Sequence, residues 1–94
     1  MSEWDTSLER PMSDFGEMYD GYYMDTDDVR IVGFAWVLPE YQGNGYFKEL
    51  SEKFKNGVRK VVIISPSIKS IELLQTQGYK YFSEEHICVW ERNE

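Results

Sequence analysis

The chain is poor in the residues on which several protein classes depend. It has one cysteine, Cys88, which excludes an internal disulfide and a zinc site made of cysteines alone. No apolar run comes near the roughly 20 residues that a bilayer-spanning helix needs. The first ten residues contain neither the basic nor the apolar stretch of a secretory signal. We therefore expect a cytoplasmic protein with no membrane segment and no metal.

The chain does contain enough apolar and aromatic side chains for one small domain. Hydrophobic residues make up 41% and aromatic residues 16% of its 94 positions, which is typical of a globular protein. We expect a single domain over residues 1–94. Residues 1–14 lack periodicity and contain Pro11, so they are interpreted as an acidic N-terminal arm or a short irregular helix.

Negative charge is concentrated in the N-terminal third. Residues 1–28 hold nine acidic residues and one arginine, a net charge of −8, whereas the rest of the chain carries +1. Binding to nucleic acid needs a basic surface, so this class of partner is excluded. The acidic segment could attract a basic protein or an amine substrate. A solvated, solubilising surface explains the same residues, and the sequence leaves both interpretations open.

The first half of the chain predicts two strands. Residues 15–24 are rich in tyrosine and include two glycines, which indicates an edge strand with a bulge or kink. Residues 25–28 form a cluster of turn-forming residues. Residues 29–38 are almost continuously apolar, as in a strand covered on both faces, and Pro39 ends that strand.

The second half predicts two helices and three more strands. Phe47, Leu50 and Phe54 recur at helical spacing, so a helix begins near Gly45. A buried strand at 58–65 follows, and this strand–helix–strand order predicts a parallel pair. A second helix begins near Ser67. It starts in the segment Ser65-Pro66-Ser67, with proline at or near the first helical position. Its apolar face is formed by Ile68, Ile71 and Leu74. Two short antiparallel strands follow at 79–83 and 86–91.

A glycine-containing turn, Gln42 to Phe47, joins the apolar strand to the first helix. The two glycines let a ligand approach the backbone closely. The first amides of the helix have no partner within the helix and favour an anion such as phosphate. Lys48 adds a positive charge. Because two glycines in such a turn are also explained by a tight turn alone, the surrounding sequence has to decide.

Two stretches resemble motifs of the GNAT superfamily of N-acetyltransferases. VLPEYQGNGYFKEL is similar to the acetyl-CoA motif, whose core is Arg/Gln-x-x-Gly-x-Gly/Ala, with Phe47 at the last small position. Residues 67–79 resemble the later motif that closes with Gly-Tyr, with Ser67 in place of the usual Asn. The resemblance covers about residues 15–82. It implies an α/β (α+β mixed) GNAT-like fold, with a central mixed sheet and two main helices, reduced at its N-terminus.

The resemblance also implies a cofactor, acetyl-CoA or CoA, and a site for it. In the family, the strand before the turn splays from its neighbour, and pantetheine lies in the gap. Backbone groups near Trp36 would then contact pantetheine, the turn amides would hold the pyrophosphate, and Ser67 would bond the pantetheine arm. The implied cofactor-binding residues are Trp36, Val37, Leu38, Gln42, Gly43, Asn44, Gly45, Tyr46, Phe47, Lys48 and Ser67.

Two groups that members of the family often use in catalysis have no match. Leu74 stands where a tyrosine often acts as general acid, and Ile31 and Gly33 fill the region of a frequent carboxylate base. Asp27 and Asp28 lie nearby in the sequence. Candidate substitutes are Tyr79, Tyr81 and His86, although His86 as a surface residue and Cys88 as a small buried hydrophobe are the simpler interpretations.

Two functions therefore remain in competition. The first is a small acetyl-CoA-dependent N-acyltransferase whose acceptor is an amine, such as a protein lysine. The second is a non-catalytic protein-binding or inhibitory module on a reduced GNAT scaffold, with an acidic aromatic N-terminal surface. The chain lacks the elements that usually wall the acceptor site in the family, so a partner or a second copy of the chain is expected to supply them. Aromatic residues near that side are Trp4, Tyr19, Tyr22, Tyr23 and Trp36.

Overall fold

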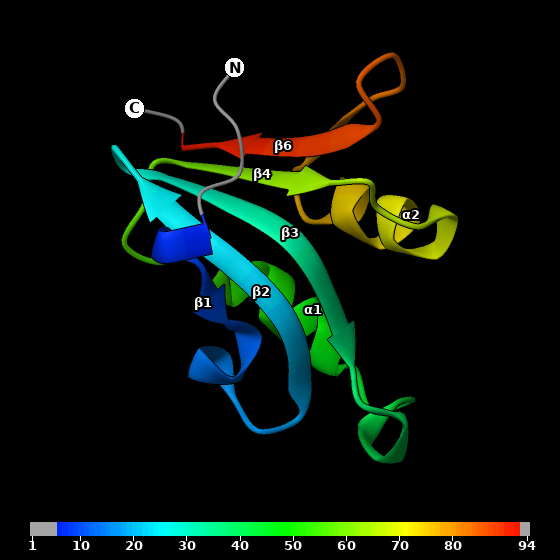
Figure 1. Ribbon diagram of the computed structural model, residues 1–94. Helices are drawn as coiled ribbons and strands as arrows, with labels where there is room; N and C mark the ends of the chain where they lie inside the picture. The colour runs from blue at the N-terminus through cyan, green and yellow to red at the C-terminus, as the bar shows by residue number, and fades with distance from the viewer. Residues whose placement is uncertain (1–5, 93–94) are drawn as a thin grey trace.

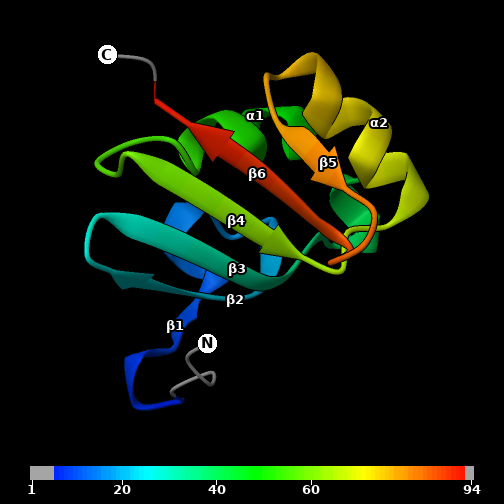
Figure 2. The same ribbon diagram turned by 90° about the horizontal axis from the view of Figure 1, so that it is seen from above.

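The computed structural model describes residues 6–92, which form a six-stranded mixed sheet with two α-helices. The strands lie side by side in the order β1-β2-β3-β4-β6-β5 (Figures 1 and 2). The strands are β1 (Arg10–Pro11), β2 (Tyr19–Thr26), β3 (Val29–Val37), β4 (Lys60–Ile64), β5 (Lys80–Phe82) and β6 (Ile87–Glu91). The α-helices are α1 (Tyr46–Lys53) and α2 (Ile68–Thr76), and the short 3-10 helices are η1 (Thr6–Leu8), η2 (Met12–Phe15) and η3 (Pro39–Tyr41).

The strand–helix–strand unit predicted from the sequence is present. β3 and β4 pair in parallel, with α1 between them in the chain. Every other pair of neighbouring strands is antiparallel, including β4 with β6 and β5 with β6. The prediction of a mixed sheet with two helices is therefore confirmed, as is the extension of the sheet by the two C-terminal strands.

The β2–β3 hairpin differs from its prediction in length. β2 continues to Thr26, and only Asp27 and Asp28 form the turn, with φ of 49° and 68°. Two consecutive left-handed residues are typical of a type I′ turn, whose twist matches that of the two strands. The predicted four-residue turn was too long because the sequence does not show that Asp25 belongs to the strand, where its side chain pairs with Arg30.

The bulge predicted for the strand at residues 15–24 lies instead in its partner, β3. Tyr22 pairs with Phe34 and Tyr23 with Val32, so Gly33 is an extra residue without a partner in β2. Gly21 itself stays in register, opposite Ala35. A side chain at Gly21 would lie 2.0 Å from the carbonyl oxygen of Phe34, so this glycine permits a close approach of the two strands.

Both α-helices pack against one face of the sheet. Leu50 of α1, Phe54 at the C-cap of α1 and Leu74 of α2 share a buried cluster with Val32 and Val61 of the sheet. The prediction that the β3 strand is covered on both faces was wrong at its C-terminal end. There Phe34 is 49% and Trp36 36% exposed, because these rings point to the face without helices.

The N-terminal segment, from Arg10 onwards, is built into the fold. β1 pairs with Tyr22 and Tyr23 of β2, and the Met12 side chain is fully buried in the core cluster. Residues 10–14 therefore do not form a free arm, whereas the alternative interpretation, a short irregular helix, agrees with the 3-10 helices η1 and η2. The first five residues lie outside the described chain, and with them Trp4.

The helix starts agree with the prediction, but two details of α2 do not. Gly45 and Ser67 are the N-caps of α1 and α2. Pro66 precedes the cap of α2 instead of occupying the first helical position. Ile68 is 79% exposed, because the apolar face of α2 begins one turn later.

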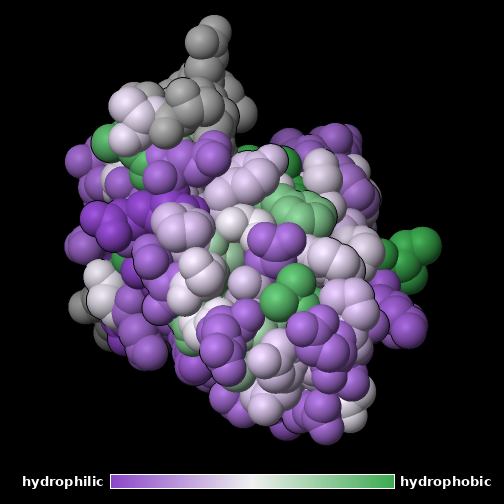
Figure 3. Space-filling model, turned by 60° about the horizontal axis from the view of Figure 1, so that its bottom comes forward, coloured by the Kyte–Doolittle hydropathy of each residue, from purple (hydrophilic) through white to green (hydrophobic). Residues whose placement is uncertain are grey.

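The face of the molecule seen from below is mixed in hydropathy. In the view from below, hydrophobic side chains are scattered among hydrophilic ones (Figure 3). No helix within residues 6–92 is long and apolar enough to cross a membrane.

Candidate functional site

The two central parallel strands separate half-way along β3. They are paired at only four positions, from Val29 with Lys60 to Val32 with Ile63, although β3 runs on to Val37. The separation begins at the extra residue Gly33. Beyond this point β3 curves away from β4, as Figure 1 shows. A gap between two central strands exposes backbone groups that a regular sheet would pair.

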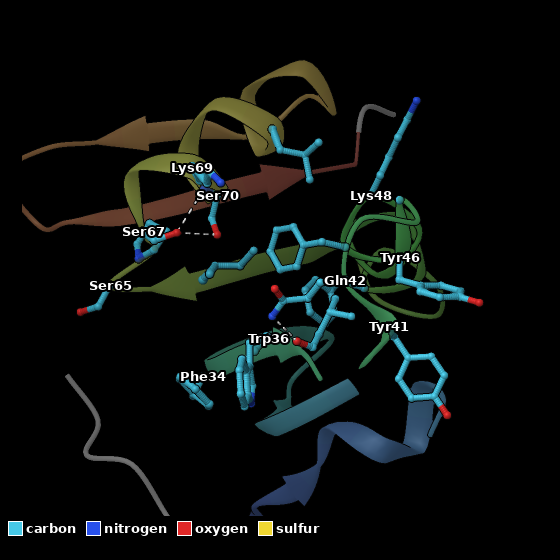
Figure 4. A pocket seen from close by; sticks show the side chains of 18 of the residues that line it. Phe34, Trp36, Tyr41, Gln42, Tyr46, Lys48, Ser65, Ser67, Lys69 and Ser70 are labelled. Carbon is cyan, nitrogen blue, oxygen red and sulfur yellow. Dashed lines mark hydrogen bonds between the residues drawn. The ribbon is translucent and has the colours of Figure 1, made fainter. Parts of the chain in front are cut away.

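A cleft of about 660 Å³ occupies this gap. Its volume lies within the range of about 300–1,000 Å³ that is usual for small-molecule sites. The lining includes residues of the helix face, such as Phe47 and Leu73, and of the opposite face, such as Phe34 and Ile64. Phe34 and Trp36 lie side by side at one end, with Tyr41 and Tyr46 at the other (Figure 4). The cleft therefore extends across the plane of the sheet.

The turn at the mouth of the cleft has the backbone conformation that its glycines suggest. Gly43 and Gly45 have φ of 86° and 77°, a region that L side chains rarely adopt. A side chain at either position would meet nothing within 4 Å, so open space lies above the turn. No side chain caps α1, which leaves its first amides available to a ligand. These features suit a phosphate group.

Hydrogen bonds fix which backbone groups of β3 face the gap. The Leu38 N–H donates to the Met18 carbonyl at 2.9 Å, on the side of β2. Because backbone groups alternate along a strand, those of Val37 point to the gap. The Gln42 side chain donates to the Val37 carbonyl at 2.9 Å, which leaves the Val37 N–H directed into the gap. The dashed line in Figure 4 marks this bond.

The start of α2 forms the opposite side of the cleft. The Ser67 hydroxyl caps the helix by accepting a bond from the Ser70 N–H at 3.2 Å, and it also contacts the Ser70 hydroxyl at 2.9 Å. Lys69 lies beside these serines, and Lys48 extends from the first turn of α1 (Figure 4). Both lysines therefore belong to the first turn of a helix, where the helix dipole and the side chain favour an anion together.

The titratable groups of the lining are two lysines and two tyrosines, Tyr41 and Tyr46. The Tyr41 hydroxyl donates to Glu17, 3.5 Å away, and this carboxylate raises the pKa of Tyr41 above its usual value. Tyr41 is therefore protonated at neutral pH. Within residues 6–92 the lining contains no carboxylate, histidine or cysteine. The same part of the chain holds no cluster of side chains suited to a metal ion.

Most of the residues that the resemblance implied for the cofactor line this cleft. Leu38 and Asn44 do not: Leu38 uses its amide in the bond to Met18, and the Asn44 side chain donates to the Tyr41 carbonyl at 3.1 Å. The residues of the predicted set that lie together around the cleft are Trp36, Val37, Gln42, Gly43, Gly45, Tyr46, Phe47, Lys48 and Ser67.

The three catalytic candidates lie outside the lining of the cleft. The buried Tyr79 hydroxyl donates to the Ser51 carbonyl at 2.9 Å, and burial, with Glu52 adding, raises the pKa of Tyr79. Tyr81 and His86 bond each other at 2.8 Å at the β5–β6 turn. His86 is exposed, as the simpler interpretation predicted.

Other residues considered for catalysis are also elsewhere. Cys88 is fully buried in the core, which confirms its interpretation as a small hydrophobe, and burial raises the pKa of its thiol. Leu74 is likewise in the core, and its neighbour Leu73 lines the cleft instead. Asp27 and Asp28 form the turn at the start of β3, whereas the cleft lies at its end.

The sequence did not reveal the residues that line the far side of the cleft. Ser65 belongs to the β4–α2 connection, Lys69 and Ser70 to the first turn of α2, and Gly33 and Phe34 to the bulge. The glycine within an otherwise apolar strand was a usable signal for the bulge, because an isolated glycine often marks one. The β4–α2 residues follow only from the topology, which places the ends of two parallel strands together.

Comparison of the chain with protein-family models found no match, and a search of curated proteins found none.

Proposed function

We propose that the cleft binds an acyl-CoA and that the protein transfers the acyl group to an amine. The observation that carries this proposal is the divergence of β3 from β4 beside a glycine turn that begins a helix. The GNAT-like motifs recognised in the sequence supply both the turn and the start of α2. A gap of this kind accepts an extended thiol arm, and the turn accepts its phosphates.

The polar groups of the cleft support a ligand that is anionic at one end and apolar along its length. The phosphate end would rest on the amides that follow Gly45, with Lys48 at its side. Apolar side chains such as Phe47, Ile63 and Leu73 line the interior. The Ser67 and Ser70 hydroxyls offer hydrogen bonds to amide groups of the arm.

The chemistry would rely on positioning. The amine nitrogen forms a bond to the thioester carbonyl carbon, the carbon–sulfur bond breaks with its electron pair on sulfur, and CoA leaves as the thiolate while the amine proton passes to solvent. The Val37 N–H, directed into the gap, is the group suited to polarise the carbonyl oxygen. Because the described lining contains no carboxylate, histidine or cysteine, the rate would be modest and would rise with pH as the amine loses its proton.

Binding is tested with two glycine variants that carry the same strain. Gly45→Asp places a carboxylate where phosphate would bind, and Gly57→Asp places one just beyond the other end of α1. Both positions have positive φ and open space, so they share the backbone cost. By calorimetry, CoA should bind the natural protein and Gly57→Asp but not Gly45→Asp. Equal CoA binding by the two variants would overturn the proposed site.

Transfer is tested separately, by release of free CoA thiol from acetyl-CoA in the presence of an amine or a protein. Gly57→Asp should retain this activity and Gly45→Asp should lose it.

A second candidate function is a binding module that performs no chemistry. The absence of carboxylate, histidine and cysteine from the described lining favours it. CoA binding without transfer to any amine or protein would support this module and exclude the enzyme.

A further inference from the structure

Three aromatic side chains form a continuous strip on the face of the sheet without helices. We call Tyr22, Phe34 and Trp36 the aromatic row. The ring centroids of Tyr22 and Phe34 are 6.3 Å apart, and those of Phe34 and Trp36 are 6.5 Å apart. All three side chains are exposed, although aromatic rings of this size are usually buried. The extra residue Gly33 turns Phe34 and Trp36 outward, so the exposure of the row follows from the backbone of β3.

The charge beside the row is negative. Asp20 lies opposite Trp36 on β2, and its carboxylate accepts the indole N–H of Trp36 at 2.9 Å and the Gly21 N–H at 3.0 Å. These two bonds hold the carboxylate next to the ring. They also hold the Trp36 ring in place. A cation above the row would meet both the ring faces and this carboxylate.

The chain already places cations over several of its other rings. Arg30 lies 5.2 Å from the centroid of Phe15, and Lys53 lies 5.5 Å from that of Tyr19. Within residues 6–92 no lysine or arginine lies over Phe34 or Trp36. These two rings can therefore receive a cation from another molecule.

We infer that the aromatic row and Asp20 dock a basic peptide segment of a partner protein, through a lysine side chain laid over Phe34 and Trp36. A peptide is favoured over a free amine because the row continues beyond the end of the cleft, where Phe34 and Trp36 lie, to Tyr22, and a small amine would cover only part of this length. The net charge of −7, with −8 in the first 28 residues, attracts a chain of several positive charges more strongly than a single ammonium group. This docking does not depend on acyl transfer.

The test measures binding of a fluorescent lysine-rich peptide, and of the same peptide with every lysine acetylated. Acetylation keeps the length of the side chain and removes its charge. We expect acetylation to weaken binding at least about fivefold, the effect of losing one exposed cation–ring contact. Equal binding of both peptides would overturn the inference.

Variants locate the site. Phe34→Leu and Trp36→Leu should each weaken binding of the peptide about fivefold. Phe82→Leu is the matched control, because Phe82 is an equally exposed ring on β5 outside the cleft, and it should change nothing. Asp20→Asn keeps an acceptor for Trp36 and should still weaken binding. Thermal unfolding of each variant shows that it is folded, and equal affinity of Phe34→Leu and Phe82→Leu would contradict the assignment.

Two further outcomes distinguish other occupants. Butylamine that binds as well as the peptide would show a small-molecule site instead of a docking surface. A concentration-dependent dimer that Phe34→Leu dissociates, with no peptide binding, would show that a second copy of the chain covers this face. Either result would overturn the inference, whereas CoA binding is tested separately by the variants at Gly45 and Gly57.

Discussion

At the scale of single residues, Arg30 makes the most interactions of any charged side chain in the described fold. Its guanidinium donates to both oxygens of Asp25, at 2.8 and 3.1 Å, and to the Phe54 carbonyl at 2.9 Å. It lies within about 5 Å of the ring centroids of Phe15 and Tyr23. The sequence showed only an arginine inside an apolar strand. Nothing in its spacing indicated that it ties the β2–β3 hairpin to the end of α1.

Replacing Arg30 should therefore be costly. Arg30→Met leaves the carbonyl groups at the end of α1 and the Asp25 carboxylate without their donor, and we expect a loss of about 2–4 kcal/mol of unfolding free energy. Lys60→Met removes an exposed pair with Glu91 at 3.8 Å and should cost less than about 0.5 kcal/mol. Urea unfolding measures both. Similar costs for the two variants would show that burial of the guanidinium contributes little.

The buried tyrosines predict a loss of stability at high pH. Burial raises the pKa of Tyr79 above its unfolded value of about 10, and it raises that of Tyr23 in the same direction. A raised pKa stabilises the fold below pH 10, and this contribution is lost as the pH rises above 10. Tyr79→Phe should weaken the dependence of the unfolding free energy on pH above 10, while costing about 1 kcal/mol at neutral pH through the lost bond to Ser51. An unchanged alkaline slope would contradict this role.

At the scale of elements, the sequence predicted what local pattern controls. Pro39 ends β3, and the apolar spacing of Leu50 and Phe54 identified α1 and its buried face. The sequence did not predict features that depend on contacts between segments far apart in the chain. The exposure of Phe34 depends on the register against β2, and the exposure of Ile68 depends on where α2 meets the sheet. For the cleft, the glycine turn was visible in the sequence, whereas its far wall comes from a connection that follows β4.

The hairpin turn offers a prediction at this scale. Asp27 and Asp28 both adopt left-handed backbone, which Asn and Gly accept at lower cost in a type I′ turn. The double variant Asp27→Asn, Asp28→Gly should raise the unfolding free energy by about 1 kcal/mol. Thermal unfolding checks this, with CoA affinity as the control, because the turn lies at the other end of β3 from the cleft. A fall in the midpoint would show that the two aspartate side chains contribute contacts that stabilise the turn.

At the scale of the whole molecule, the N-terminal segment completes the core. Met12 is fully buried, although it precedes the first long strand. Composition gave no sign of this, because one methionine in a polar segment has no periodicity. The acidic character of the segment was visible in the sequence, whereas its description as an arm missed both the burial of Met12 and the pairing of β1 with β2.

Met12→Ala should accordingly cost about 2–4 kcal/mol of unfolding free energy, as for other large-to-small changes in a core. Leu8→Ala, at an exposed position of η1, should change it by less than about 0.5 kcal/mol. The comparison by urea unfolding distinguishes an integral segment from a tail. Equal and small effects would mean that the core closes without Met12.

The extra residue at position 33 decides which side chains of β3 point to each face of the sheet. Before it, even-numbered side chains such as Val32 face the helices, and after it odd-numbered ones such as Val37 do. The alternation of side chains along β3 therefore changes phase at Gly33. Deleting this residue would move every side chain after it to the opposite face of the sheet. Phe34 and Trp36 would then point to the face that carries the helices, while Ala35 and Val37 would leave the core and point to solvent. One residue without a side chain decides both which rings reach the solvent and where the two central strands part.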